Sequence, residues 1–244
     1  MQGSLRSQQH PLIRQLADCI ESVWREHLEL SPYTLPEDLG YIEGSLEGER
    51  LTIENHCYQT PQFRKLHLEL AQVGNSLDIL HCVMFPNRNY ALPIFGTDLV
   101  GSQRAGISAA IADLSPINRD RTLPEAYQQA LSALAPPQFS QPRALPEWGD
   151  IFSDFCLFIR PDGASEEAQF LERVRDFLTI HCQIARSSTP LTAAPDITHV
   201  LAGQQNYCTK QQQNDKTRRV LEKSFGPEWT ERYMTTMLFD FVAV

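Results

Sequence analysis

Apolar and polar positions alternate in two different ways along the chain, and the change divides it into a strand-rich part and a helix-rich part. Residues 11–28 carry apolar side chains at helical spacing, which predicts an amphipathic helix. From residue 41 onward, the pattern is the period-two alternation or the short apolar run that is typical of strands. The predicted strands are residues 41–46, 50–58, 63–73, 77–85, 94–100 and 106–114.

The last third of the chain returns to helical spacing. Residues 165–185 and residues 228–241 each predict a helix that packs by one apolar face. Residues 197–224 are polar and glutamine-rich and then basic, and their pattern predicts no element. A further strand is predicted over residues 151–159, and the prolines of residues 136–147 indicate a long connection. Strands first and helices mostly at the ends favour one antiparallel sheet with helices packed on it.

Length and charge limit the classes of function. The chain has 244 residues, no internal repeat and no clear linker, so we expect a single domain over residues 1–244. Its net charge of −9 argues against nucleic-acid binding, which needs a basic surface. No apolar run approaches the roughly 18 residues of a membrane span, and the first residues lack a secretory signal pattern. We therefore expect a soluble, cytoplasmic protein that does not contact membranes.

The sequence also lacks the patterns of bound cofactors. The six cysteines are scattered and form no CxxC pair, so neither a structural zinc site nor an iron–sulfur cluster is supported. Glycine-rich nucleotide loops are missing, which argues against a nicotinamide or flavin site of the Rossmann type. We expect a protein with no metal and no bound cofactor.

Three ionisable residues interrupt otherwise apolar strands: Glu69, His81 and Asp98. Burial raises the pKa of a carboxyl group, so such a group can keep a proton at neutral pH and donate it to a substrate. A lone histidine in a strand is nevertheless more often a hydrogen-bonded core or surface residue. His67 shares a face with Glu69 by period-two alternation, and that face could simply be solvated.

Several long segments resemble the ferredoxin-dependent bilin reductases, in particular the phycocyanobilin-forming branch. The similarity is carried by residues 36–86, which include HLEL and DILHC, and by AAIADLSP, WGDIFSDFCLFIRP and QQNDKTRRVLEKSFG. It extends from about residue 30 to the C-terminus, and the first 30 residues resemble the family only loosely. The resemblance implies an α/β fold, a three-layer α/β/α sandwich with a central antiparallel sheet.

The resemblance also implies an activity. Members of this family reduce biliverdin IXα with electrons delivered singly by reduced 2Fe–2S ferredoxin, and they bind no prosthetic group. The branch in question carries out a four-electron reduction to phycocyanobilin, first at the D-ring vinyl group and then at the A-ring vinyl group. Such proteins are usually monomers.

Residue roles follow from the same resemblance. Asp98 protonates the bilin early, Glu69 serves the D-ring vinyl group, and His81 relays protons beside Asp98. The presence of both Glu69 and His81 favours the phycocyanobilin-forming branch. The substrate-binding candidates are His67, Ser108, Arg143, Asn214 and Lys216, among which the cations would bind the propionates.

Ferredoxin is acidic, and the densest basic cluster of this acidic chain is a candidate for its docking site. The cluster consists of Lys216, Arg218, Arg219 and Lys223. An ordinary solvated helix face is the alternative. Two alternatives also remain open for the function: a two-electron reductase of the same family, and a bilin carrier without catalysis.

Overall fold

An eight-stranded antiparallel sheet forms the middle layer of the protein. The computed structural model describes residues 4–118 and 120–240. The strand order is β1-β3-β4-β5-β6-β7-β8, and β2 also pairs with β3. The strands are β1 (Ser31–Pro32), β2 (Tyr41–Leu46), β3 (Glu49–Gln59), β4 (Phe63–Val73), β5 (Leu77–Pro86), β6 (Ile94–Ser102), β7 (Gly106–Ser115) and β8 (Leu157–Ile159).

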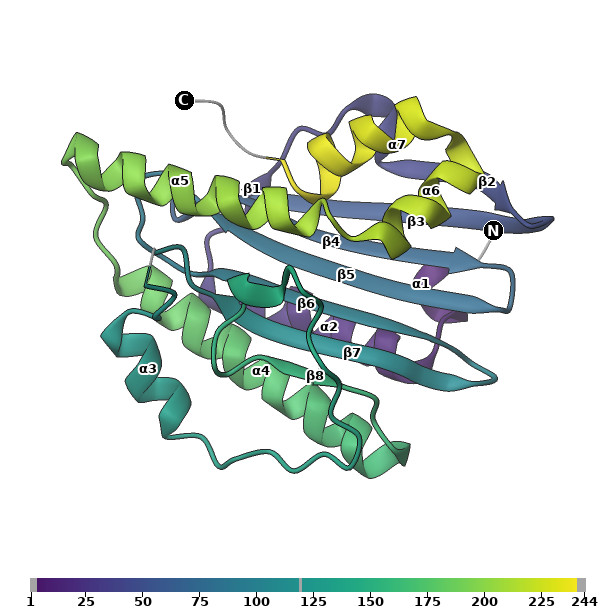
Figure 1. Cartoon of the computed structure of the whole chain (residues 1–244), viewed down its shortest axis with the longest axis horizontal. Helices are drawn as coiled ribbons and strands as arrows, with labels where there is room; N and C mark the ends of the chain where they lie inside the picture. Colours follow the sequence, from purple (N-terminus) through teal and green to yellow (C-terminus); the bar gives the residue numbers. More distant parts are fainter. Residues whose placement is uncertain (1–3, 119, 241–244) are drawn as a thin grey trace.

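Helices cover one face of this sheet with the main apolar core between them (Figure 1). They are α1 (Leu5–Gln8), α2 (Pro11–His27), α3 (Glu125–Ser132) and α4 (Gly163–Ser187). Helix α2 begins where the His10 side chain accepts a hydrogen bond from the Leu12 backbone N–H and Pro11 occupies the first turn. Its apolar side packs against α4 and β5.

The C-terminal helices cover the opposite face. They are α5 (Ala194–Gln211), α6 (Asp215–Phe225) and α7 (Pro227–Tyr233), followed by a π-helical turn, η3 (Met234–Leu238). In Figure 1, α5 crosses in front of the strands, while α6 and α7 lie beside β2 and β3. A second apolar cluster fills the space between these helices and the sheet. The predicted three-layer α/β/α sandwich is therefore confirmed.

Strand β4 shows how the sequence pattern generates the two cores. Leu66, Leu68 and Leu70 belong to the core under α2 and α4. The alternate residues His67 and Glu69 point to the other face, because successive side chains in a strand alternate. That face is covered by helices, and His67 is fully buried. The suggestion that it could be solvated is wrong.

Two predicted elements differ from the structure. Residues 151–159 are not a continuous strand: a 3₁₀ turn, η2 (Gly149–Ile151), precedes a tight turn at Ser153, and only Leu157–Ile159 joins the sheet. The predicted helix over residues 228–241 ends its α-helical part at Tyr233 and continues as the π-helical turn; residue 241 lies outside the described residues. Glutamine-rich residues 197–224, which predicted no element, fall largely in α5 and α6.

Another 3₁₀ turn, η1 (Glu37–Leu39), precedes β2. No helix within residues 4–118 and 120–240 combines the length and apolarity needed to cross a lipid bilayer.

Candidate active site

Four polar residues lie in one row across the middle of the sheet, on the face covered by α5–α7. The strand register places Asn55 opposite Glu69, and Glu69 opposite His81. It also places His81 opposite Asp98. Directly paired residues of antiparallel strands point to the same face, with Cβ atoms roughly 4.5–5.5 Å apart. The sheet thus brings together the three ionisable residues that the sequence analysis singled out.

His81 and Asp98 form a hydrogen-bonded pair within this row. His81 Nδ1 lies 2.6 Å from Asp98 Oδ1. Burial by itself would lower the pKa of His81, but the charge of Asp98, its hydrogen bond and the charge of Glu69 outweigh burial and raise that pKa. The Asp98 side chain is 44% exposed, so it is not enclosed by the sheet as the sequence suggested. The His81 imidazole is therefore held beside a carboxyl group that a ligand can reach.

Glu69 is buried and contacts the C-terminal helices. The Tyr233 hydroxyl of α7 lies 2.5 Å from Glu69 Oε2 and 3.1 Å from Asn55 Oδ1. Burial raises the pKa of Glu69, although the nearby His81 charge and the Tyr233 hydrogen bond oppose the shift. Burial thus favours the protonated form of Glu69.

Asn55 links this contact to the neighbouring strand and to the loop before β2. Asn55 Nδ2 donates to the Leu39 carbonyl at 2.7 Å, so Asn55 Oδ1 is the acceptor of this side chain. The Tyr233 hydroxyl lies within hydrogen-bond distance of both Asn55 Oδ1 and Glu69 Oε2, and the shorter contact is its donation to Glu69.

His67 connects to the same network from the next pair along β4. Its Nε2 lies 2.7 Å from Asn55 Oδ1, so the Nε2–H donates to that oxygen. Burial holds the pKa of His67 well below its usual range. The His67 and His81 rings meet edge to face at 5.8 Å, and their other nitrogens, Nδ1 and Nε2 respectively, are buried with no hydrogen-bond partner among the described residues.

The C-terminal strap, residues 234–240, covers this end of the row. Phe239 packs edge to face on the His81 ring, with centroids 5.6 Å apart. The strap is held by two cations of β4: Lys65 Nζ donates to the Met237 carbonyl at 2.8 Å and to the Asp240 carboxylate, and Arg64 pairs with the same carboxylate. These contacts fix the cover over His81 to the sheet.

Two predicted substrate-binding residues meet where the row reaches β8. Arg143 Nη1 donates to the Ser108 carbonyl at 2.9 Å, and its guanidinium lies over the Phe158 ring. Phe158 pairs with Ile111, which pairs with Asp98. Arg143 therefore lies at the end of the same row, over Phe158 of β8, which is three strands away from His81 of β5. The Ser108 hydroxyl is already used, donating to the Val100 carbonyl.

The other predicted anchors lie at the start of α6. Asn214 caps this helix, because its side-chain oxygen accepts a hydrogen bond from the Lys216 backbone N–H. The structure thus explains Asn214 without a ligand. The Lys216 ammonium makes no hydrogen bond or ion pair within the described part of the chain.

The proposed ferredoxin cluster on α6 is partly compensated by carboxylates. Arg218 pairs with Glu231 at 2.8 Å, and Lys223 pairs with Glu47 at the same distance. Arg219 lies 3.7 Å from Asp215. The sequence could not reveal this compensation, because Glu47 and Glu231 come from other elements. Lys216 is the member of the cluster without a paired carboxylate among the described residues.

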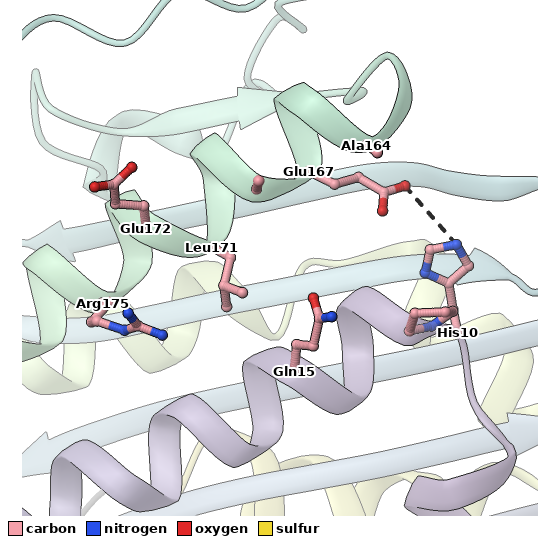
Figure 2. Close-up of a pocket in the computed structure, with 9 residues that line it drawn as sticks. His10, Gln15, Ala164, Glu167, Leu171, Glu172 and Arg175 are labelled. Atoms are coloured by element: carbon pink, nitrogen blue, oxygen red, sulfur yellow. Dashed lines mark ion pairs between the residues drawn. The ribbon is translucent and has the colours of Figure 1, made fainter.

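A surface groove on the other side of the molecule is separate from this row. It lies between α2 and α4, and Figure 2 shows His10, Gln15, Glu167, Leu171 and Arg175 around it. His10 and Glu167 form a loose contact of 3.9 Å across it. Its lining comes from the helices that cover the opposite face of the sheet, so it does not communicate with the row.

Three residues of the site escaped the sequence analysis: Asn55, Tyr233 and Phe239. Asn55 carries a signal, since it is a polar residue in a strand that is otherwise apolar at alternate positions. Tyr233 and Phe239 look like ordinary apolar helix positions. Within the described residues, no cluster of histidine, cysteine and acidic side chains has the geometry of a metal site.

Comparison with known proteins gives this geometry a context. The family model described as ferredoxin-dependent bilin reductase matches residues 17–240. The phycocyanobilin:ferredoxin oxidoreductase of Trichodesmium erythraeum (strain IMS101) is 60% identical over 233 residues, which cover 96% of this chain and 94% of that protein. The protein of the same name from Synechococcus elongatus (strain ATCC 33912 / PCC 7942 / FACHB-805) is 60% identical over 240 residues, 98% of this chain and 96% of the relative.

The fold is also similar to a solved structure. Tomato phytochromobilin synthase, determined in complex with biliverdin, superposes with a TM-score of 0.74 at 18% identity. The alignment covers 92% of this chain and 81% of the tomato chain.

Proposed function

Because this chain belongs to the ferredoxin-dependent bilin reductase family, we propose that it reduces biliverdin IXα to phycocyanobilin with electrons from reduced ferredoxin. It is an oxidoreductase by family. The observation that carries the assignment of its chemistry is the row of Glu69, His81 and Asp98, which places two carboxyl groups and an imidazole side by side on one covered face.

The reaction requires proton donors of this kind. Each electron added to a conjugated tetrapyrrole makes it more basic, and an unneutralised charge in a poorly solvated site is costly. Four electrons and four protons convert biliverdin to phycocyanobilin. A protein that supplies protons but no electrons of its own needs groups that are protonated at neutral pH and close to the substrate.

The geometry supports an assignment of the proton donors. Asp98 is the exposed member of the row, so it is the group that protonates the bilin early, with His81 restoring its proton through the 2.6 Å hydrogen bond. Glu69 is the second donor, because burial raises its pKa and so favours its protonated form. It serves the D-ring vinyl group, the first to be reduced.

The bilin lies between the sheet and the helices α5–α7. This placement is supported by the position of the row and by the similarity to the tomato protein that was solved with biliverdin. Arg143 and Lys216 are the propionate anchors, since a guanidinium binds a carboxylate through two parallel hydrogen bonds and an ammonium as a point charge. His67, Ser108 and Asn214 support the substrate or the residues that touch it.

The electrons come singly from an external 2Fe–2S ferredoxin, and the enzyme itself binds no cofactor or metal. Ferredoxin docks near α6, the helix that carries Lys216, Arg218, Arg219 and Lys223. The enzyme works as a cytoplasmic monomer.

An anaerobic turnover assay tests this proposal. The protein is mixed with biliverdin IXα, ferredoxin, ferredoxin reductase and NADPH, the visible spectrum is followed, and the pigment is identified by chromatography. We expect loss of biliverdin through a radical intermediate and formation of phycocyanobilin. A parallel reaction without ferredoxin is the control for direct reduction.

The alternatives give different results in the same assay. A product that has gained only two electrons would identify the protein as a two-electron reductase of the family. A stable green complex that never changes would identify a carrier, and the proton-donor roles of Glu69, His81 and Asp98 would then be withdrawn.

A further inference from the structure

A second buried carboxylate lies on the face that carries the row. Asp113 of β7 is two residues beyond Ile111, the register partner of Asp98, so the two aspartates point to the same side of the sheet. Its own partner on β6 is Gly96. A side chain at Gly96 would approach the Tyr207 hydroxyl of α5 to 3.1 Å, which places Tyr207 over this part of the sheet.

Asp113 is held by three hydrogen bonds from two serines. The Ser153 hydroxyl donates to Asp113 Oδ1 at 2.5 Å, and the Ser153 backbone N–H donates to Oδ2 at 3.1 Å. The Ser115 hydroxyl also donates to Oδ2, at 2.6 Å. Only 1% of Asp113 is exposed. A buried carboxylate is stable only with such partners, so the contact with Ser153 is a strong tie between β7 and the segment before β8.

The segment tied by Ser153 carries two aromatic side chains to the covered face. Trp148 and Phe152 flank the η2 turn, their rings are 6.0 Å apart, and both pack against the apolar cluster under α5–α7. Each remains only half-buried. The turn contacts α5, and Lys210 of that helix pairs with Asp150 at 3.2 Å. Trp148 and Phe152 therefore form a wall between β7 and α5.

We propose that Asp113 is a positioning residue of the substrate site: it fixes Ser153 and so holds the Trp148–Phe152 wall where a flat conjugated tetrapyrrole contacts it. This inference rests on the proposed function, because it takes a bilin as the ligand of the covered face. Half-buried aromatic rings suit such a ligand, since they offer apolar surface and stacking at little entropic cost. Asp113 itself acts only through the wall.

The charge state of Asp113 is part of this arrangement. Burial raises the pKa of Asp113 to about 6, although both serines and two backbone N–H groups oppose the shift. The titratable groups that face it are Tyr207 from α5 and Cys156 from the turn after Ser153; burial raises the pKa of each. Protonation of Asp113 replaces an acceptor by a donor, which weakens the tie to Ser153. The wall should therefore loosen as the pH falls below about 6.

The test compares Asp113→Asn and Ser153→Ala with the wild type, and Asp154→Asn, an exposed neighbour on the same turn, is the matched control. Biliverdin IXα is titrated into each protein without ferredoxin. We expect the Kd of biliverdin to rise about tenfold in both test variants, which corresponds to the loss of one charge-assisted hydrogen bond. At saturating biliverdin, kcat should stay within about twofold, because the row is intact.

A structural readout that needs no substrate accompanies the titration. In protein labelled with ¹⁵N-serine, the Ser153 amide resonance should follow the protonation of Asp113 in the wild type and lose that titration in Asp113→Asn. An unchanged Kd in both test variants, an equal rise in Asp154→Asn, or a fall in kcat at unchanged Kd would overturn the inference. If Asp113→Asn does not fold, the Kd of biliverdin for Ser153→Ala still tests the inference.

The two proposals fail in different ways. Wild-type protein that binds biliverdin but does not turn it over contradicts the proposed function, while weaker binding by the Asp113 and Ser153 variants still supports the wall. Normal wild-type turnover together with unchanged binding by both variants contradicts the wall alone.

Discussion

His81 and Asp98 face each other on neighbouring strands, and one hydrogen bond of 2.6 Å joins the imidazole Nδ1 to the carboxylate Oδ1. The strand register sets this contact, because the two residues are directly paired across β5 and β6. His81 lies deep against the C-terminal strap, whereas Asp98 is open on one side. The pair can therefore take a proton from the interior and present it to a ligand.

Replacing Asp98 by asparagine should keep the shape of this pair and remove its acid. The amide oxygen of the introduced side chain can still accept from His81 Nδ1, so we expect the Kd of biliverdin to change by less than about threefold. Turnover should fall at least about 100-fold, the usual scale for losing a general acid, and an early radical should accumulate. Electron paramagnetic resonance during turnover measures the radical. Asp162→Asn, at an exposed position before α4, is the control; wild-type turnover by Asp98→Asn would refute the role.

Glu69→Gln tests the second donor. Glutamine fills the same space and can hydrogen-bond to Tyr233, but it cannot supply a proton. We expect biliverdin to bind normally, while reduction of the D-ring vinyl group slows about 100-fold or more. Chromatography should then show pigments reduced at other positions, and a bound radical should accumulate. An exposed glutamate of α2 gives the control variant Glu26→Gln, and a normal product pattern from Glu69→Gln would remove this residue from the mechanism.

Tyr233→Phe should move the pKa of Glu69 further upward. The Tyr233 hydrogen bond lowers that pKa, so its removal leaves burial less opposed. The pH limb on which activity falls as Glu69 ionises should shift to higher pH, and the protein should lose about 1–2 kcal/mol of stability. The pH–rate profile and urea unfolding measure the two effects.

Tyr127→Phe provides a matched control for this experiment. The Tyr127 hydroxyl is also buried and lies 2.8 Å from His181 Nδ1, but on the opposite face of the sheet. The Tyr127→Phe variant should lose a similar free energy of unfolding and should not change the pH–rate profile. A shift of the profile in both variants would show that the effect is general destabilisation.

His181 should make the protein sensitive to acid. Burial lowers the pKa of His181 to about 3, so the folded state binds fewer protons than the unfolded state between that value and the ordinary histidine pKa. Stability from this group is complete above about pH 6.5 and is lost as the pH falls, by about 2 kcal/mol at pH 5. Urea unfolding at pH 7 and pH 5 measures the loss. The double variant Tyr127→Phe/His181→Phe should lose less stability between these pH values; an identical loss would contradict the prediction.

Charge reversal on α6 should weaken ferredoxin docking. Arg219 is the best position to test, because it is well exposed and its pair with Asp215 is loose at 3.7 Å. We expect Arg219→Glu to raise the KM for ferredoxin several-fold, with a smaller effect at high salt, and to leave biliverdin binding unchanged. Arg186→Glu, at an exposed position near the end of α4, changes the net charge by the same amount as Arg219→Glu. This control variant should behave like the wild type. A KM that is independent of salt would exclude the patch.

The alternating pattern of β4 made much of the fold predictable from sequence. One face of this strand is predicted to be core because it carries Leu66, Leu68 and Leu70. The period of two places His67 and Glu69 on the other face. The strand boundaries follow from the same alternation and from turn residues. The sequence did not predict α5 and α6, because their glutamine-rich and basic faces carry too few apolar residues for a clear period. Their helices are stabilised by packing over the sheet.

The active-site residues divide in the same way. Glu69, His81 and Asp98 were identifiable because a charge inside an apolar strand is costly and needs a reason. Their alignment in one row depends on strand register, which is a property of the whole sheet. Asn55 and Tyr233 are 178 residues apart in the chain. The sequence by itself thus determined which strands exist and which side chains are unusual in them. Only the tertiary structure decided what covers those side chains and which of them share a hydrogen bond, because such contacts arise between elements that the chain brings together on folding.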